Sequence, residues 1–182
     1  LAAPEEFCYA ALLRAYGQRN PLEADREHCL IDLGYLATRV HIYAGDRFEA
    51  TRVVDAGSAA LDAVIADALH VDEHVAQSYR LANHENCLAL EPCRAIYRSV
   101  ALDIMRAVNF YGYNNPTSAL EWAWLCGGGS CNPYLLDTLQ DTLNLELRPA
   151  HQLLPSLPEN RDIDLALYPA VAGVILQEET RR

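Results

Sequence analysis

Residues 29–54 hold the clearest alternation of apolar and polar positions in the chain. A short apolar run ends at Asp32 and Gly34. The chain then alternates between apolar and polar residues over 38–43, turns, and returns over 48–54. A period of two is typical of strands, and a short polar turn between two such runs is typical of a hairpin. The pattern therefore predicts three consecutive antiparallel strands.

Apolar residues at helical spacing predict six helices around these strands. The longest helix begins at Pro92, and glycines are expected to end two helices, at Gly17 and near Gly112. Two further strands follow the longest helix, and the first of them carries Trp122 and Trp124 on one face, covering the core. The predicted helices span 4–16, 61–69, 71–80, 92–111, 133–143 and 169–176, and the two further strands span 120–125 and 145–147.

Two segments show neither period. Residues 81–92 are polar and predicted to be irregular, and residues 148–162 carry three prolines and are predicted to form a surface loop. In the last helix, Ala172 and Gly173 are small enough to allow close packing against another element. With 182 residues, 51% of them hydrophobic, the chain is long enough for one domain with a sizeable core.

The charge of the chain limits its partners. A formal net charge of -11 and the absence of any cluster of basic residues argue against a nucleic-acid backbone as the main partner. The chain has no apolar run of the ~20 residues that span a bilayer, and its start lacks the basic-then-apolar layout of a signal peptide. We expect a soluble intracellular protein. The chain starts at Leu1 rather than at Met, and we expect it to be part of a longer protein.

Six cysteines do not form a recognisable framework. Most of them fall inside predicted helices and strands, where a reduced thiol acts as a small buried hydrophobe. A zinc site can be imagined from four cysteines and one histidine, but their spacing is irregular, so packing is the favoured interpretation. The residues of that imagined site are His84, Cys87, Cys93, Cys126 and Cys131.

Two turns carry candidate chemistry. Asp32 and Gly34 follow one predicted strand, and the glycines of residues 127–129 follow another. Ligands of open sheets bind beyond the carboxyl ends of strands, and glycines let backbone N–H groups or a flat ring approach a ligand closely. Either turn can equally be a purely structural one, with Asp32 only capping it. Both interpretations stay open for each turn taken alone.

The order of these motifs resembles the second half of an actin-like ATPase, with PilM-like type IV pilus assembly proteins as the most similar family. The resemblance covers roughly residues 8–177 and rests on collinear order and similar spacing more than on any single motif. The segments that carry it are Asp32-Leu-Gly-Tyr-Leu-Ala-Thr38, Arg52-Val-Val-Asp-Ala-Gly57, Val75-Ala-Gln-Ser-Tyr-Arg80, the helix 92–111 and Leu125-Cys-Gly-Gly-Gly-Ser130.

The resemblance implies an α/β, ribonuclease-H-like fold. Its mixed five-stranded sheet would have three antiparallel strands followed by parallel strands, with helices on both faces. The whole chain, residues 1–182, would be one domain, the second lobe of a two-lobed protein. Residues 71–92 would form a reduced outer subdomain, and residues 169–177 would connect the lobes.

The resemblance also implies a site for ATP and Mg²⁺ in the complete two-lobed protein. Asp32, Gly34 and Thr38 would contact the terminal phosphates, with Asp32 reaching the metal through water. Residues Gly127, Gly128 and Gly129 would lie against the adenosine. Arg80 stands where the family has a basic residue near the nucleotide.

Some residues depart from the family. Tyr35 and Leu36 are bulkier than is usual in that turn and would crowd phosphates, and Cys126 and Ser130 differ mildly from the usual pattern. The first lobe would precede residue 1. Phosphoryl transfer depends on groups from both sides of the cleft, so we expect no ATP hydrolysis and no catalytic residue in this lobe alone.

The leading functional hypothesis is a nucleotide-binding scaffold of a type IV pilus or related secretion assembly. The protein would be cytoplasmic and held at the inner membrane through the cytoplasmic tail of a membrane protein, without inserting into the membrane itself. The hypothesis is also compatible with homo-oligomers. One alternative is an interaction module of the same fold that has lost ATP binding. A third hypothesis is a phosphotransferase related to sugar kinases, disfavoured because no second cleft with a substrate-binding acid or base is evident.

Overall fold

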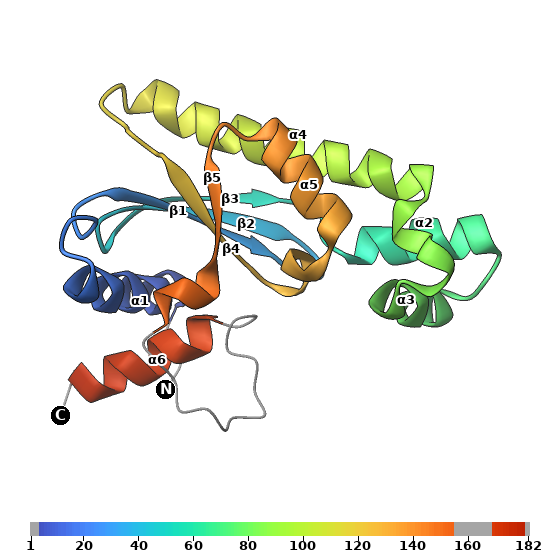
Figure 1. The fold of residues 1–182 in the computed structure, drawn as a ribbon, viewed down its shortest axis with the longest axis horizontal. Helices are drawn as coiled ribbons and strands as arrows, with labels where there is room; N and C mark the ends of the chain where they lie inside the picture. The colour runs from blue at the N-terminus through green and yellow to red at the C-terminus, as the bar shows by residue number, and fades with distance from the viewer. Residues whose placement is uncertain (1–3, 155–168, 181–182) are drawn as a thin grey trace.

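A single mixed sheet forms the centre of the molecule (Figure 1). The computed structural model describes residues 4–154 and 169–180, with side chains up to residue 176. The strand order is β3-β2-β1-β4-β5; β1 pairs with β2 and β2 with β3 in antiparallel fashion, whereas β1–β4 and β4–β5 are parallel. This confirms the predicted mixed sheet. The strands are β1 (Glu27–Leu33), β2 (Thr38–Ala44), β3 (Arg47–Val54), β4 (Trp122–Cys126) and β5 (Glu146–Pro149).

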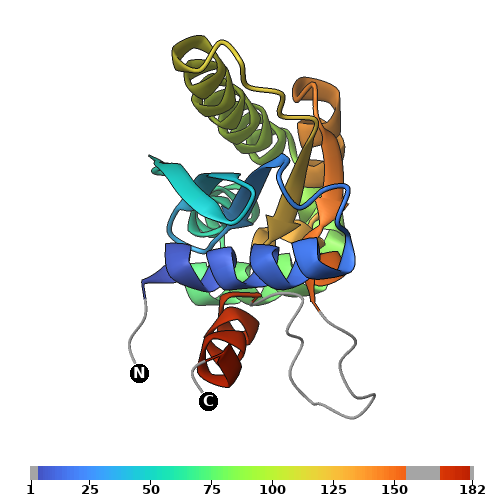
Figure 2. The same cartoon turned by 90° about the vertical axis from the view of Figure 1, so that its left-hand side faces the viewer.

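Helices cover both faces of the sheet, as predicted. Helices α1 and α6 lie on one face, and α4 and α5 lie on the other, while α2 extends beyond the ends of the strands and packs against α3 and α4 (Figures 1 and 2). The helices are α1 (Glu5–Arg19), α2 (Ala59–Leu69), α3 (Glu73–Ala82), α4 (Glu91–Asn114), α5 (Pro133–Thr142) and α6 (Pro169–Thr180). Three short 3₁₀ helices are η1 (His84–Ala89), η2 (Gly128–Cys131) and η3 (Ala150–Leu153).

Alternation along the strands divides the apolar side chains between two cores. In β1, Ile31 and Leu33 point into the larger core under α2, α4 and α5, whereas Leu30 points toward α1. Trp122 and Trp124 share the α1 face and are buried there, which confirms their predicted packing role. The central strands β1 and β4 are therefore buried on both faces, whereas most of β3 is exposed, and the ends of the buried strands are a place where a ligand can reach the sheet.

Several predicted boundaries were wrong. Helix α1 continues through Gly17 to Arg19. Gly17 allows close packing against Ala24, because an added Cβ would lie 3.1 Å from that residue. Helix α4 passes Gly112 and ends at Asn114. A glycine inside a helix costs only about 1 kcal/mol, which a long packed helix tolerates. Strand β4 begins at Trp122 rather than at residue 120, and the segment 81–92 includes η1 and the start of α4.

The last helix packs as its small residues predicted. A Cβ added to Gly173 would lie 2.1 Å from the carbonyl oxygen of Cys8, so α6 and α1 touch backbone to backbone. The predicted loop 148–162 begins with the end of β5 and with η3, and its residues 155–162 lie outside the described residues.

Two further predictions concern the cysteines and the outer subdomain. Five of the six cysteines are buried, which confirms the predicted packing of Cys8, Cys29 and Cys93, whereas Cys131 is exposed. The assignment of residues 71–92, which hold α3 and η1, to a reduced outer subdomain stays a prediction. Among the described helices, none is long and apolar enough to cross a membrane.

Candidate functional site

The two predicted turns meet at one edge of the sheet. Strands β1 and β4 are parallel neighbours, and Asp32 pairs with Cys126, so the turns that follow them leave the sheet side by side. Gly127 has a φ of +80°, and a Cβ there would lie 2.3 Å from Asp32 Oδ1 and 2.7 Å from the Leu33 carbonyl oxygen. Only glycine allows this contact. The fold thus brings together two features that are nearly a hundred residues apart in the sequence.

The turn between β1 and β2 is held by the start of α2. The backbone N–H of Ser58 donates to the Gly34 carbonyl at 3.1 Å, and that of Ala59 donates to the Tyr35 carbonyl at 2.9 Å. A Cβ on Gly57 would lie 2.3 Å from the Tyr35 carbonyl oxygen. The first N–H groups of α2 therefore bind protein carbonyls and are not free for an anion.

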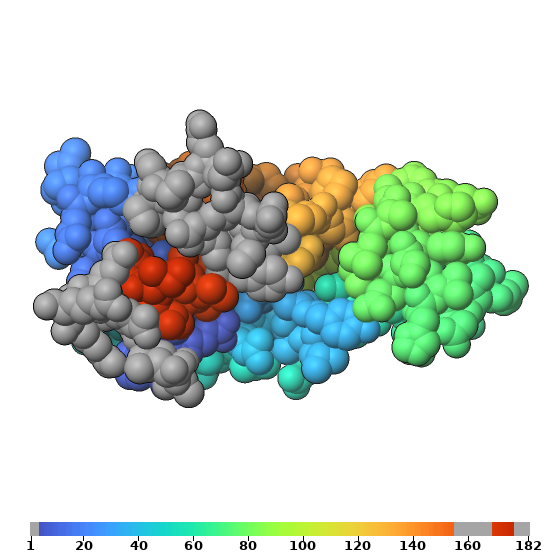
Figure 3. All heavy atoms as spheres, turned by 90° about the horizontal axis from the view of Figure 1, so that it is seen from below, coloured from blue at the N-terminus to red at the C-terminus, as the bar shows by residue number. Residues whose placement is uncertain are grey.

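A cavity of about 230 Å³ opens beside these turns. It lies between the β1–β2 turn, the start of α2, the end of α3, the first half of α4 and the glycine loop. The β1–β2 turn, the end of α3 and the glycine loop lie side by side on the face shown in Figure 3. Its polar lining residues are Thr38, Ser58, Arg80, Asn83, Cys131 and Asn132, and its apolar wall includes Leu33, Leu61, Leu88, Ile96, Tyr97, Val100 and Leu135.

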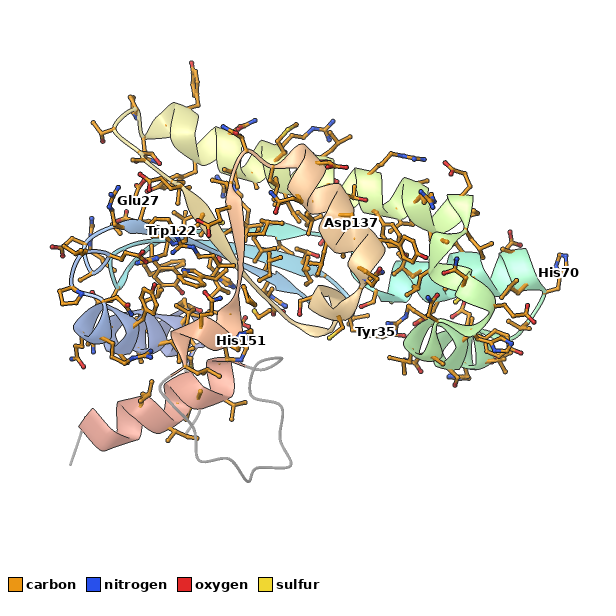
Figure 4. All side chains as sticks on the ribbon, in the orientation of Figure 1. Glu27, Tyr35, His70, Trp122, Asp137 and His151 are labelled. Carbon is orange, nitrogen blue, oxygen red and sulfur yellow. The ribbon has the colours of Figure 1, made fainter. Side chains whose placement is uncertain are left out.

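Five of the seven predicted site residues line this cavity: Gly34, Thr38, Arg80, Gly128 and Gly129. The other two lie beside it. Whether these residues contact a nucleotide stays a prediction, but the structure brings them to one rim. Tyr35 lies at the same end of the molecule as the cavity (Figure 4). Its side chain is 49% exposed and does not line the cavity, so it does not fill the cavity.

The three glycines of the loop have different physical roles. Gly127 is required by its backbone conformation, and Gly129 by packing, because an added Cβ would lie 2.8 Å from the Cβ of Leu33. At Gly128 an added Cβ meets no other part of the described chain within 4 Å. The backbone conformation and the packing within the protein therefore explain why glycine stands at positions 127 and 129. Gly128 leaves the main chain open toward the cavity, where a flat group can lie against it.

Most polar groups of the wall are already hydrogen-bonded within the protein. Thr38 Oγ1 donates to the Ala56 carbonyl at 3.0 Å. The Asn132 side chain accepts from the N–H groups of Tyr134 and Leu135 and donates to the Tyr97 hydroxyl at 3.0 Å, which in turn donates to the Leu88 carbonyl. This network fixes the start of α5 against α4. The wall of the cavity is consequently preformed.

Arg80 is paired with a residue that the sequence analysis missed. Its Nε lies 2.6 Å from Asp62 Oδ1, and the two side chains are only 12% and 4% exposed. The signal was available: Asp62 precedes the buried Ile65 and Ala66 by three and four positions, so it lies on the inward face of α2. The carboxylate offsets the charge that was expected to face a nucleotide.

Asp32 points away from the cavity, toward α1. There burial, and next the carboxylate of Glu5, raise the pKa of Asp32 to about 6, while Arg39 acts in the opposite direction. Glu5 accepts a hydrogen bond from the Tyr9 hydroxyl at 2.9 Å, and Arg39 Nε lies 3.9 Å from it. Glu5 lies 27 positions before Asp32 in the sequence, and periodicity alone cannot place it beside Asp32.

His41 belongs to the same group on the α1 side. Its Nδ1 shares a hydrogen bond with Thr51 Oγ1, and its Nε2 is buried, lies 4.0 Å from Glu5 Oε2 and has no hydrogen-bond partner among the described residues. Burial lowers the pKa of His41. In the described part of the chain no group of three or more His, Cys, Asp or Glu side chains is arranged to hold a metal ion. The predicted contact of Asp32 with a hydrated metal stays a prediction.

Comparison with known proteins shows the fold. No protein-family model and no curated protein matches the chain. The solved PilM–PilN type IV pilus biogenesis complex matches with a TM-score of 0.68 and 21% identity, over 93% of this chain and 51% of that chain. EutJ, an ethanolamine utilization protein from Carboxydothermus hydrogenoformans, matches with a TM-score of 0.62 and 18% identity, over 91% and 52%. The archaeal actin homolog Ta0583 matches with a TM-score of 0.59 and 12% identity, over 93% and 54%.

These similarities confirm the predicted fold class. The chain has the fold of one lobe of an actin-like ATPase. It spans about half the length of the solved chains that it matches, 51% and 52% for the first two. At these identities the likeness extends to the fold and no further.

Proposed function

We propose that this chain is the nucleotide-binding second lobe of a two-lobed, actin-like scaffold protein. ATP with Mg²⁺ would bind between this lobe and a first lobe. One observation carries the proposal: the cavity is bounded both by the turn after β1 and by the glycine loop after β4. Ligands of α/β sheets bind where such turns meet at the carboxyl ends of strands.

The cavity suits the nucleoside part of such a ligand. A flat base can lie against the main chain at Gly128, where an added Cβ would have no described residue within 4 Å apart from its two chain neighbours. Leu88, Ile96 and Leu135 supply an apolar wall, and Asn83 adds a polar group at its border. A mostly apolar pocket with few polar groups is the usual environment of a bound ring system.

The phosphate end is less complete on this lobe. The hydroxyls of Thr38 and Ser58 donate to backbone carbonyls, and Arg80 faces Asp62. The chain supplies Gly34 at the rim of the cavity and, on the α1 side of β1, the carboxylate of Asp32, which is proposed to reach a hydrated metal. Further donors to the phosphates would come from a first lobe. Because phosphoryl transfer needs groups on both sides of the cleft, hydrolysis is not proposed for this lobe alone.

The proposed setting is a type IV pilus or related secretion assembly. One of the solved structures with this fold is a PilM–PilN type IV pilus biogenesis complex, in which a protein of this fold is assembled with a protein partner. By analogy, the partner of this chain would be the cytoplasmic tail of an inner-membrane pilus assembly protein. The protein would then be cytoplasmic, held at the membrane by that tail, with nucleotide setting its conformation.

A nucleotide-free interaction module of the same fold is the second candidate. The closed ion pair of Arg80 with Asp62 favours it, as do the exposed apolar side chains of Tyr35 and Leu36 in the turn. The phosphotransferase hypothesis gains no support from the described residues.

A thermal-shift titration of the two-lobed protein with ATP and Mg²⁺ separates the first two candidates. Ligand at a hundred times its Kd stabilises by about 2.7 kcal/mol, which is roughly 5–10 °C in Tm for a lobe of 150–250 residues that unfolds on its own and about half of that if both lobes unfold together. Gly128→Val should abolish the shift, and Asp32→Ala should reduce its dependence on Mg²⁺. Gly112→Val, on α4, is a matched control, because an added Cβ there also meets no other residue within 4 Å in the part of the chain that the structure describes. No shift at millimolar ATP would favour the nucleotide-free module.

A further inference from the structure

Strand β3 forms one edge of the sheet. Among the described residues no segment pairs with its outer side, and Figure 2 shows it outermost, with α4 above it and α1 below it. It is eight residues long. An edge strand of this length presents backbone N–H and C=O groups to solvent, which is a template for pairing with another chain.

The first part of this edge is protected. The pairing of β3 with β2 is irregular between Ile42 and Tyr43, which leaves Glu49 as an extra residue, a bulge. Glu49 also pairs with Arg47 at 2.6 Å. Bulges and charged pairs are devices that discourage edge pairing. Residues 50–54 lie beyond the bulge, and there the register with β2 is regular.

Residues 50–54 offer different chemistry on the two faces of the sheet. Arg52 pairs with Val40, which lies in the core under α4, and its guanidinium lies 4.9 Å from the centre of the Phe110 ring on α4. Val53 pairs with Arg39 on the α1 side and is 53% exposed. An added strand would therefore meet a cation on one face and an apolar side chain on the other, at successive positions.

Arg52 has no acidic partner among the described residues. Within the described part of the chain its side chain contacts the Thr51 carbonyl oxygen and the Phe110 ring, and no carboxylate lies within 4.0 Å of it. Phe110 is itself 53% exposed. In a protein with a net charge of -11, an unpaired arginine stacked on an exposed ring is a local site for a negative charge.

We propose that residues 50–54 of β3 bind an extended segment of a partner protein as an additional strand of the sheet. The segment alternates acidic and apolar residues. An acidic side chain lies against Arg52 and Phe110, and the next, apolar side chain lies against Val53. Main-chain hydrogen bonds supply affinity and the alternating side chains supply specificity, as in other cases of strand addition. This inference goes beyond nucleotide binding and does not depend on it.

The test uses three short peptides and the whole protein. The first peptide is a hexamer in which Glu and Val alternate, the second has Lys in place of Glu, and the third is the acidic hexamer with its central Val replaced by Pro. Binding is measured by calorimetry, and the amide shifts of the protein by NMR. The acidic hexamer should bind and shift the amides of residues 50–54, and the other two should bind at least about tenfold more weakly.

Two matched variants test whether the positive charge of Arg52 binds the acidic side chain of the peptide. Arg52→Glu should lower the affinity for the acidic hexamer by about tenfold or more, because two negative charges then face each other. Arg98→Glu makes the same change of charge on an exposed arginine of α4 that pairs with Glu91, and it should change affinity less than about twofold.

Four results would overturn the proposal. They are no binding of the acidic hexamer at millimolar concentration, equal binding of the Pro or the Lys peptide, amide shifts along the outer face of α4 in place of β3, and self-association of the free protein that Arg52→Glu abolishes. The third would indicate docking on the helix, and the fourth a second copy of this chain at the edge.

Discussion

The buried ion pair between Asp62 and Arg80 determines whether Arg80 is available to a ligand. We predict that Arg80→Met destabilises the fold strongly, because it leaves the carboxylate of Asp62 without its counter-charge. The double variant Asp62→Leu with Arg80→Met removes both charges and should recover most of the loss. Arg98→Met provides the control, since Arg98 pairs with Glu91 on the surface.

The magnitude follows from burial and geometry. The Asp62 side chain is 4% exposed, and two nitrogens of Arg80 lie 2.6 and 3.5 Å from its oxygens. Breaking a buried pair by removing one partner costs about 3–5 kcal/mol, whereas replacing both partners by apolar residues is often close to neutral. An exposed pair such as Arg98–Glu91 is worth only about 0–1 kcal/mol. The buried pair should therefore differ from its control by at least about 2 kcal/mol.

Urea unfolding followed by circular dichroism measures these differences, with the slope of the transition checking that the two-state assumption holds. A loss below about 1 kcal/mol for Arg80→Met would refute the structural role. If the same variant then also weakened ATP binding in the two-lobed protein, Arg80 would serve a ligand and not the pair with Asp62.

Three other predictions follow from single contacts. Gly129→Val should cost about 1–3 kcal/mol in urea unfolding through overlap with Leu33, whereas Gly128→Val should leave stability nearly unchanged; equal losses would contradict their different roles. Burial lowers the pKa of His28 to about 4, so the unfolded state takes up a proton first and stability should fall by up to about 3 kcal/mol as pH drops from roughly 6.5 to 4. His28→Gln should remove that component, and an unchanged pH profile would refute it. Gly173→Val should separate α6 from α1, seen as faster amide exchange in α6, and unaltered exchange would contradict the close contact.

Much of the fold was predictable because it follows from local periodicity. The alternation of apolar and polar residues predicts the hairpin of β2 and β3. Asn132 and Pro133 predict the start of α5, because the Asn side chain can cap the helix and the Pro ring suits its first turn. Helix ends were less predictable. Gly17 and Gly112 are typical helix terminators, yet tertiary packing and the length of the helix outweigh their propensity.

Contacts between distant residues were not predictable from the sequence. Glu27 accepts hydrogen bonds from the hydroxyls of Tyr111 and Ser118 and from the backbone N–H of Ala119, all more than 80 residues away. The same holds for Glu5 beside Asp32. A periodicity can show that a side chain lies on a polar or an apolar face, but it does not show which other segment that face meets.

The candidate site divides into two halves, and β1 separates them. The cavity lies on the side of α2 and α5, whereas the carboxyl groups of Asp32 and Glu5 lie on the side of α1. Burial and the neighbouring carboxylate raise the pKa of Asp32 to about 6, so its ionised form is disfavoured within this lobe. Any positive group brought to this rim would stabilise the ionised form, and by linkage the ionised form would favour that group. The apolar cavity and the carboxylate with the raised pKa therefore lie on opposite sides of β1, and the turn at Gly34 joins the two sides.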